Sequence, residues 1–233
     1  MSPNIYFILT DVRDETSMQE LFSTFKPSMV FHTAAYKHVP MMEANPYEAV
    51  KLNILATTFL ADLALLHNTK KFVFISTDKA VNPISIMGLT KRIGERYLMD
   101  LNSKNSTKFL ITRFGNIIGS NGSLIPLFNK QLELGRPLTV TSPEVSRYFI
   151  PKLKACQHIL EISNEAHGKH ALFTFNMGKP IKIIDLANID SCAFIETRDL
   201  GSLESDGLRF KVLGRFDNAE MRGCSLMVSQ DLS

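Results

Sequence analysis

The sequence predicts an α/β fold built on a parallel, Rossmann-like sheet, with a small C-terminal substrate-binding lobe. Short apolar runs at 72–75 and 109–114 are rich in β-branched and aromatic residues, as buried strands are. Segments with helical periodicity separate such runs, and the connections between them are short. Chains that alternate strands and helices in this way form doubly wound sheets with right-handed crossovers.

The N-terminal part predicts strands at 5–9 and 28–32, with an amphipathic helix between them. Asp11 and Asp14 provide turn and capping groups ahead of that helix. On the residues alone, Asp11 and Arg13 are most simply a helix cap and a surface ion pair.

The next predicted helix is the most apolar segment of the chain, residues 49–66. It contains Lys51, Asn53 and Asp62, which favours a helix buried in a core over one that spans a membrane. Pro46 stands where the start of a helix accepts proline.

Polar residues follow the predicted strand at 72–75 directly, and they are Ser76, Thr77, Asp78 and Lys79. Open α/β sheets bind ligands at the carboxyl ends of their strands, so these side chains are candidates for a site. The residues alone explain Asp78 and Lys79 equally well as an ion pair at the end of a strand.

Helical periodicity begins beyond this polar stretch, with Ser85 as the expected cap. Met87 and Lys91 are four residues apart, so they share one face of the helix and can reach the same ligand. We expect that face to differ from the one that enters the core. The strand at 109–114 then leads into a glycine-rich loop at 115–122.

Composition excludes several classes of protein. The chain has 233 residues, 45% of them hydrophobic, which is enough for one full core and a small appended lobe. Its net charge of +3 comes from scattered lysines and arginines and gives no case for nucleic acid. Cys156, Cys192 and Cys224 form no metal-binding pattern, so we expect no metal and a reducing, cytoplasmic setting. The N-terminus lacks the features of a signal peptide.

The motif STDKAVNP at 76–83, followed by MGLTKR at 87–92, resembles the extended short-chain dehydrogenase/reductase family. It resembles in particular the branch of CapD-like polysaccharide-biosynthesis proteins, which includes UDP-N-acetylglucosamine 4,6-dehydratases. Three further stretches share the resemblance: FHTAAYKHVPMMEANPYEAVKLN at 31–53, RFGNIIGSNGSLIPLF at 113–128 and LTVTSPEVSRYF at 138–149.

The resemblance covers residues 11–187 and implies a division of the chain. Residues 1–187 would form an NAD(P)-binding Rossmann-like domain, with elements of the substrate lobe from about residue 120. Residues 188–233 do not follow the family, and we treat them as a divergent tail.

A nicotinamide cofactor, NAD or NADP, is implied by the same resemblance. Asp11 and Val12 match positions that contact adenine, and the small side chains of Ala34 and Ala35 let ribose and phosphates approach the backbone. The full set of implied cofactor-binding residues is Asp11, Val12, Ala34, Ala35, Lys37, Asn53, Ser76, Lys91 and Ile117.

The implied substrate is a UDP-sugar such as UDP-N-acetylglucosamine. Thr141 and Arg147 resemble positions that hold the nucleotide diphosphate, and an arginine can grip phosphate oxygens with two parallel hydrogen bonds. His38 and Asn116 are the other implied substrate-binding residues.

The implied reaction is a 4,6-dehydration, in which C4 is oxidised, the C5 proton and the C6 hydroxyl leave, and the cofactor is regenerated at C6. By resemblance Lys79 is the base for the C5 proton and Asp78 the acid for the C6 oxygen. Thr77 would hydrogen-bond the C4 oxygen. Lys91 would bind the nicotinamide ribose and stabilise developing negative charge.

Met87 occupies the position where the wider superfamily has a tyrosine that accepts the C4 hydroxyl proton. Methionine cannot ionise, so we do not assign Met87 a catalytic role. The base at C4 stays open among Asp78, Lys79 and a water molecule held by Thr77.

Two departures from the family leave the activity of this chain open. All twelve glycines lie at Gly88 or later, so the glycine-rich turn that binds pyrophosphate does not occur ahead of the first matched strand. The arginine-proline-glycine-glutamate segment expected after residue 187 is absent as well. The alternatives to a dehydratase are therefore a non-catalytic remnant and a nucleotide-sugar epimerase.

Partners follow from the same departures. Strands without neighbours promote association, so we expect a homo-oligomer or an aggregation-prone chain. Full-length members of the family are often tethered to the inner membrane by helices that precede this region.

Overall fold

The computed structural model describes residues 5–102, 107–120, 124–136, 146–164, 171–182, 199–203 and 210–215. The chain divides into two compact units, Met1–Phe114 with Cys156–Phe175 and Gly115–Ala155 with Asn176–Ser233.

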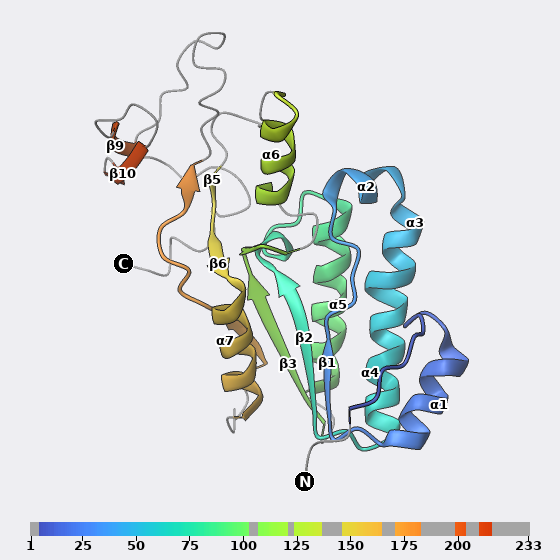
Figure 1. Ribbon diagram of the computed structural model, residues 1–233. Coiled ribbons are helices and arrows are strands. Elements are labelled where there is room, and N and C mark those ends of the chain that lie inside the picture. Colours follow the sequence, from blue (N-terminus) through green and yellow to red (C-terminus); the bar gives the residue numbers. More distant parts are fainter. Residues whose placement is uncertain are drawn as a thin grey trace. The chain divides into compact units, whose positions relative to one another are not determined.

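A four-stranded sheet in the order β1-β2-β3-β7 forms the centre of the first unit (Figure 1). Its strands are β1 (Met29–His32), β2 (Lys71–Thr77), β3 (Lys108–Phe114) and β7 (Leu172–Thr174). Every neighbouring pair is parallel, which confirms the predicted parallel, Rossmann-like sheet. The predicted strands at 28–32, 72–75 and 109–114 correspond to β1, β2 and β3.

Successive side chains of β2 and β3 point to opposite faces of the sheet, and helices cover both faces. Phe72 and Phe74 pack with residues of α1 (Glu15–Phe25), α4 (Thr57–Leu66) and α5 (Ile86–Asn102). Val73 packs on the opposite face against Ile162 of α7 (Lys152–Asn164). This explains why β2 reads as a continuous apolar run rather than an alternating one.

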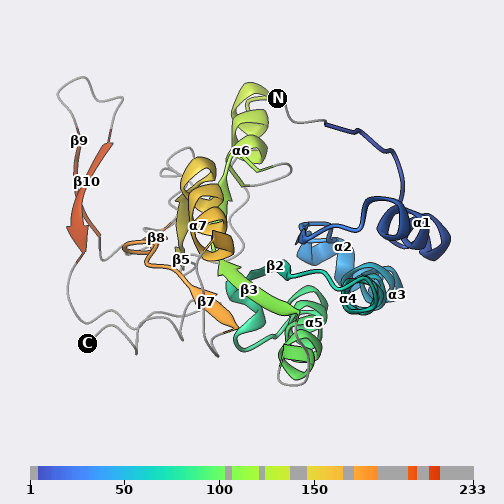
Figure 2. The same ribbon diagram turned by 90° about the horizontal axis from the view of Figure 1, so that it is seen from below.

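Capping groups and backbone conformation set the two ends of α1 on the first face of the sheet. Asp14 caps α1, because its Oδ1 accepts from the Ser17 N–H at 3.3 Å and its Oδ2 from the Ser17 hydroxyl at 2.6 Å. The chain leaves α1 at Lys26, which has a left-handed φ of 43°. Helices α4 and α5 lie side by side (Figure 1 and Figure 2) and pack on the same face of the sheet.

The apolar helix predicted at 49–66 is a longer composite run. It consists of α3 (Pro46–Ala49), the π-helical segment η1 (Val50–Ala56) and α4, and the short helix α2 (Val39–Ala44) precedes it. Within the described part of the chain this run, Pro46–Leu66, is the one helix long and apolar enough to cross a membrane, and half of it is buried. The core helix of a soluble protein passes the same test.

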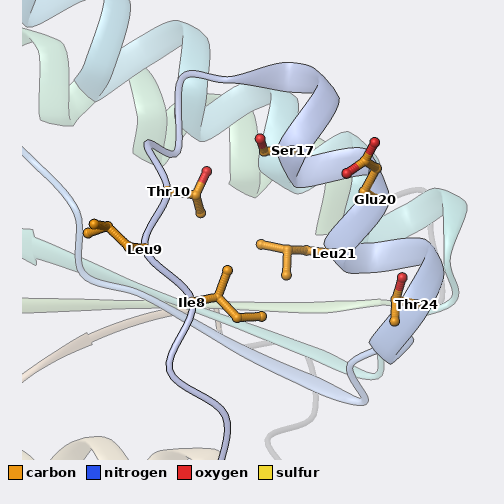
Figure 3. Close-up of a pocket in the computed structure, with 7 residues that line it drawn as sticks. All are labelled: Ile8, Leu9, Thr10, Ser17, Glu20, Leu21 and Thr24. Carbon is orange, nitrogen blue, oxygen red and sulfur yellow. The ribbon is translucent and has the colours of Figure 1, made fainter.

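The strand predicted at 5–9 does not form. Residues 5–10 have no regular secondary structure and are exposed, Phe7 to 95%. The segment runs beside α1, and the two border a hollow of about 260 Å³ (Figure 3). Its lining residues are Ile8, Leu9, Thr10, Ser17, Glu20, Leu21 and Thr24. A strand requires a neighbouring strand for its backbone hydrogen bonds, and β1 ends the sheet on this side.

The second unit contains short strand pairs. Strands β4 (Asn116–Ile118) and β6 (Phe149–Pro151) are parallel, whereas β5 (Ser146–Arg147) and β8 (Ile181–Lys182) are antiparallel. Helix α6 (Leu124–Glu133) follows the glycine-rich loop. Within 188–233, β9 (Asp199–Leu203) and β10 (Phe210–Arg215) pair antiparallel.

A buried histidine joins the sheet to the composite helix. The Nε2 of His32 lies 2.9 Å from the Thr57 hydroxyl oxygen, and its ring stacks on that of Phe74 with centroids 5.7 Å apart. Only 4% of His32 is exposed. Burial lowers the pKa of His32 to about 3, and the positive charge of Lys91 acts in the same direction.

We therefore predict that His32 makes the first unit sensitive to acid. Its pKa in the folded chain lies below the ordinary 6.5, so the unfolded chain binds the proton first, and stability falls as pH decreases from 6.5 toward 3. Between about pH 7.5 and about pH 5 this removes about 2 kcal/mol. Urea unfolding of wild type and His32→Leu at both pH values measures it. Equal losses in the two proteins would contradict the prediction.

Candidate active site

The carboxyl end of β2 carries three of the predicted catalytic residues in one hydrogen-bonded cluster. Thr77 ends the strand and Asp78 begins η2 (Asp78–Ala80), a single 3₁₀ turn. The Thr77 hydroxyl donates to Oδ1 of Asp78 at 2.9 Å and accepts from the Lys79 N–H at 3.3 Å. The ammonium of Lys79 donates to the same Oδ1 at 3.1 Å. The side chains of Thr77 and Lys79 therefore both donate to one carboxylate oxygen of Asp78.

The other carboxylate oxygen of Asp78 is the unusual atom of this cluster. Asp78 is 3% exposed, and its Oδ2 is buried with no hydrogen-bond partner among the described residues. A buried polar atom left without a partner costs on the order of 1–3 kcal/mol. Such an atom in a folded protein calls for an explanation, and a catalytic role is one.

Lys91 lies on α5 and is almost fully enclosed, with 5% of the residue exposed. Its Nζ lies 3.9 Å from the centroid of the Phe74 ring, within range of a cation–π contact. Burial lowers the pKa of Lys91 to about 7, although the negative charge of Glu95 opposes this shift. The amine is therefore divided between charged and neutral forms near neutral pH.

Gly88 allows the first turn of α5 to touch the η2 turn. A Cβ at this position would clash with the Lys79 carbonyl oxygen, because the two atoms would lie much closer than van der Waals contact. The Ser85 hydroxyl accepts from the Gly88 N–H at 3.1 Å, as expected of a cap, and Glu43 of α2 accepts from the Ile86 N–H at 2.8 Å. Sequence reasoning missed Gly88, although a glycine inside a helical pattern is a signal of close packing.

The sequence predicts that the face of α5 carrying Met87 lies apart from the core. For Met87 this prediction is wrong. Met87 is buried with Met42 and Ala49, and the partly buried side chains Tyr36 and Val39 pack around them. The physical reason is that α2 and α3 cover this side of α5, which the periodicity of α5 alone does not reveal.

The loop after β1 carries Ala34, Ala35 and Lys37, and the side chain of Asn53 holds it in place. Oδ1 of Asn53 accepts from the Tyr36 N–H at 2.9 Å, while its Nδ2 donates to the Tyr36 carbonyl at 2.9 Å and to the Thr90 hydroxyl at 3.1 Å. Asn53 lies in the π-helical segment η1, a local geometry that often occurs at functional sites. The hydrogen bonds of Asn53 thus connect the loop at Tyr36 to Thr90, the residue before Lys91.

Lys37 and His38 complete this loop. Both are exposed, and His38 precedes the first residue of α2. Partial burial lowers the pKa of Lys37, and the positive charge of Lys79 lowers it further. Lys37 of the loop and Lys79 of the η2 turn are therefore close enough for their positive charges to repel each other.

The turn at Asp11 and Val12 is tied to the same loop through Arg13. The Arg13 guanidinium pairs with Asp11 at 2.7 Å and with Glu48 of α3 at 3.0 Å, and it lies 5.9 Å from the centroid of the Tyr36 ring. Hydrogen bonds from the Arg13 side chain and backbone, together with its positive charge, lower the pKa of Asp11 to about 2. The ion pair expected from the sequence is present, whereas the cap of α1 is Asp14.

Ser76, a predicted cofactor-binding residue, lies in β2 of the first unit, and the other predicted residues belong to the second unit. Asn116 and Ile117 lie in β4, and the Asn116 N–H donates to the Tyr148 carbonyl at 2.8 Å. Arg147 donates through Nη1 to the Ser146 carbonyl at 2.9 Å. Thr141 lies outside the described residues. Within the described part of the chain, no group of three His, Cys, Asp or Glu residues is placed to hold a metal ion.

A protein-family model described as "Polysaccharide biosynthesis protein" matches residues 1–210. The chain belongs to this family. It is 47% identical over 204 residues to the capsular polysaccharide biosynthesis protein CapD of Staphylococcus aureus, with 87% of this chain and 34% of CapD covered. The probable polysaccharide biosynthesis protein EpsC of Bacillus subtilis is also 47% identical, over 77% of this chain and 30% of EpsC. The chain thus spans about a third of the length of these two relatives.

Other relatives carry different names. A UDP-glucose 4-epimerase of Rickettsia canadensis is 36% identical over 68% of this chain and 47% of that protein. A protein of Methanocaldococcus jannaschii named an uncharacterised membrane protein is 38% identical over 81% of this chain and 56% of that protein.

Solved structures confirm the extended short-chain dehydrogenase/reductase fold. Pen from Bacillus thuringiensis is 34% identical with a TM-score of 0.66, over 72% of this chain and 52% of that chain. A double mutant of dTDP-glucose 4,6-dehydratase from Streptomyces venezuelae, solved with NAD bound, has a TM-score of 0.68 at 20% identity, over 78% of this chain and 61% of that chain. The predicted resemblance to the CapD-like branch is therefore confirmed.

We predict that Gly88→Ala disturbs the site by separating α5 from η2. The new methyl group meets the backbone oxygen of Lys79, which cannot move without the turn, and overpacking of this kind costs about 1–3 kcal/mol. This outweighs the gain of roughly 1 kcal/mol in helix propensity. Urea unfolding measures the change, with the exposed neighbour Leu89→Ala as the control. An increase in stability would contradict the prediction.

We predict that Lys91→Met stabilises the ligand-free chain. The pKa of Lys91 is about 7 in the folded chain and 10.5 ordinarily, so the unfolded chain binds more protons between these values, and wild-type stability rises with pH across that window. Methionine removes the buried charge, and we expect about 1–2 kcal/mol more stability at neutral pH and a flat pH dependence. Thermal unfolding between about pH 7 and about pH 10 tests this, with the exposed Lys108→Met as the control. A lower melting temperature for Lys91→Met would refute it.

Proposed function

We propose that this chain provides the catalytic part of an NAD(P)-dependent nucleotide-sugar 4,6-dehydratase in the biosynthesis of surface polysaccharide. UDP-N-acetylglucosamine or a similar UDP-sugar is the proposed substrate. The observation that carries the proposal is the Thr77–Asp78–Lys79 cluster, in which two donors share Oδ1 of Asp78 and leave Oδ2 buried and unpaired.

The residues of the first unit fit a nicotinamide dinucleotide in several respects. Lys91 is a buried amine that lacks the full solvation a free cation would have, and ribose hydroxyls can supply the missing hydrogen-bond partners. Ala34 and Ala35 are small and partly buried in a loop that Asn53 fixes. When bound, the cofactor would supply reversible two-electron oxidation at C4 of the sugar, so that the overall reaction has no net redox change.

The protein's own groups then move protons. Nζ of Lys79 takes the proton from C5, which a ketone at C4 makes acidic. Asp78 donates a proton from Oδ2 to the C6 oxygen, the C6–O bond breaks, and water leaves. The proton held by Lys79 then returns to C5 as C6 is reduced, and the proton of the C4 hydroxyl, passed on through Thr77, is the one that Asp78 gives to the C6 oxygen.

The acceptor for the C4 hydroxyl proton lies in the same cluster. Met87 cannot accept it, and its side chain is buried among apolar residues. The Thr77 hydroxyl is hydrogen-bonded to Asp78, so a proton released at the C4 oxygen has a direct path to that carboxylate. Lys91, charged in part of the molecules at neutral pH, stabilises negative charge as it develops.

A nucleotide-sugar 4-epimerase is the second candidate, and a specific observation favours it. Curated relatives named UDP-glucose 4-epimerase match 68% of this chain at 36% identity. An epimerase also oxidises C4 reversibly, but it removes no proton from C5 and no water. It has no use for an acid beside a base, so the Asp78–Lys79 pair favours the dehydratase.

We predict that the purified chain, given NAD⁺ or NADP⁺ and UDP-N-acetylglucosamine, yields a product lighter by one water. Asp78→Asn and Lys79→Met each reduce turnover by about 10²–10⁴-fold, because each removes a proton-transfer group. The exposed Lys108→Met serves as the matched control and keeps wild-type turnover. Mass spectrometry of the nucleotide sugar measures the result.

The outcomes separate the candidates. A product of unchanged mass with an inverted C4 identifies an epimerase. If a chain shown to be folded binds neither dinucleotide nor UDP-sugar by calorimetric titration, it is a non-catalytic member of the family and the proposal is withdrawn.

A further inference from the structure

A fully buried carboxylate, Glu95, lies one turn beyond Lys91 on α5, and 0% of the residue is exposed. Its Oε1 accepts from the Ser76 hydroxyl at 2.6 Å and from Nε of Arg113 at 2.8 Å. Its Oε2 accepts from Nη2 of Arg113 at 2.6 Å and from Nη1 of Arg92 at 3.2 Å. The contact with Arg113 is bidentate, the strongest form of the arginine–carboxylate pair.

These contacts join three elements at one level of the fold. Ser76 of β2 and Arg113 of β3 are register partners in the parallel sheet, and Thr77 is the next residue along β2. Glu95 reaches this pair from α5. The carboxylate therefore attaches the last-but-one register pair of β2 and β3 to the helix that carries Lys91.

We propose that Glu95 is a positioning residue of the candidate site, which holds the Thr77–Asp78–Lys79 turn against α5 and supplies a buried negative charge one helical turn from Lys91. The kinetic part of this inference rests on the proposed function, whereas the part that concerns the charge of Lys91 does not.

The energetics favour a role in position over a role in stability. Burial of a carboxylate and a guanidinium carries a desolvation cost that their attraction often only balances, so apolar side chains would stabilise the fold equally well. A bidentate ion pair instead fixes direction and distance. Its location directly beneath the catalytic turn is where fixed geometry matters most, because small misplacements of reacting groups reduce rates strongly.

The charges around Lys91 make Glu95 the counter-charge. His32 of β1 interacts electrostatically with Lys91, and its low pKa, about 3, keeps it neutral at physiological pH. The η2 turn packs on α5 and contributes Asp78 and Lys79, which pair with each other.

The other nearby charges have partners of their own. Glu43 of α2 caps α5, and Glu48 of α3 pairs with Arg13 and Lys51. Arg92 and Arg113 lie on the carboxylate of Glu95 and temper its charge without cancelling its effect on Lys91.

Glu95→Gln tests the charge directly, because glutamine keeps the size of the side chain and can still accept from Ser76. In protein labelled with ¹³C at lysine Cε, the Lys91 signal is assigned by its absence in Lys91→Met and titrated against pH. We expect its midpoint, near 7 in wild type, to fall by at least about one unit in Glu95→Gln. The exposed Glu20→Gln is the matched control and leaves the midpoint unchanged.

Glu95→Asp separates charge from reach. The shorter carboxylate stays negative, so the Lys91 midpoint stays near that of wild type, but it cannot span both Ser76 and Arg113. We expect kcat for the UDP-sugar to fall about 10-fold or more, with KM changed by no more than about twofold, in both Glu95 variants. The alkaline limb of the pH–rate profile, where Lys91 loses its charge, should move with the Lys91 midpoint in Glu95→Gln alone.

Two outcomes overturn the inference. One is a folded Glu95→Gln protein in which the Lys91 midpoint does not move. The other is that wild type is active and Glu95→Asp has the same kcat. This second outcome also tests the inference if Glu95→Gln fails to fold. A midpoint that moves in a chain with no turnover supports the charge-setting role of Glu95 and counts against the proposed function only.

Discussion

The close packing of helix α5 against the carboxyl end of strand β2 is the constraint on which the rest of the candidate site depends. Gly88 brings the first turn of the helix onto the backbone of Lys79, and Glu95 ties its third turn to Ser76 and Arg113. Lys91 lies between these two points of attachment. The helix is thus fixed on both sides of the one residue expected to meet both cofactor and substrate.

Several polar and charged groups in this region have lost the solvation that water would give them, which raises their free energy in the folded chain. The amine of Lys91 is enclosed against an aromatic ring, Oδ2 of Asp78 lacks a partner among the described residues, and the Glu95 carboxylate is wholly buried. Each lowers the stability of the ligand-free chain or only balances its own desolvation. The apolar packing of Phe72, Phe74 and their neighbours offsets this, since both faces of the sheet are covered. Groups held in costly surroundings at a sheet edge are typical of functional sites.

The parts of the fold with strong periodicity could be predicted from sequence. Strands β2 and β3, helix α5 and the position of Thr77 to Lys79 at a strand end follow from apolar patterns and turn residues. The segment at 5–9 has the same apolar character as a strand, yet it pairs with no other strand among the described residues. Strand formation depends on a partner, and local composition contains no information about whether one is present.

The sequence by itself determined the family and the order of the strongly periodic elements, because both depend on residue types and spacings along the chain. Tertiary structure alone decided which side chains touch. Met87 and Lys91 share a helical spacing, but α2 and α3 bury Met87 in a core cluster whereas Lys91 lies over the Phe74 ring. Ser76, Glu95 and Arg113 are far apart in sequence, and only strand register and helix packing bring them within hydrogen-bonding distance. Such contacts depend on distances across elements, which no pattern along a single element specifies.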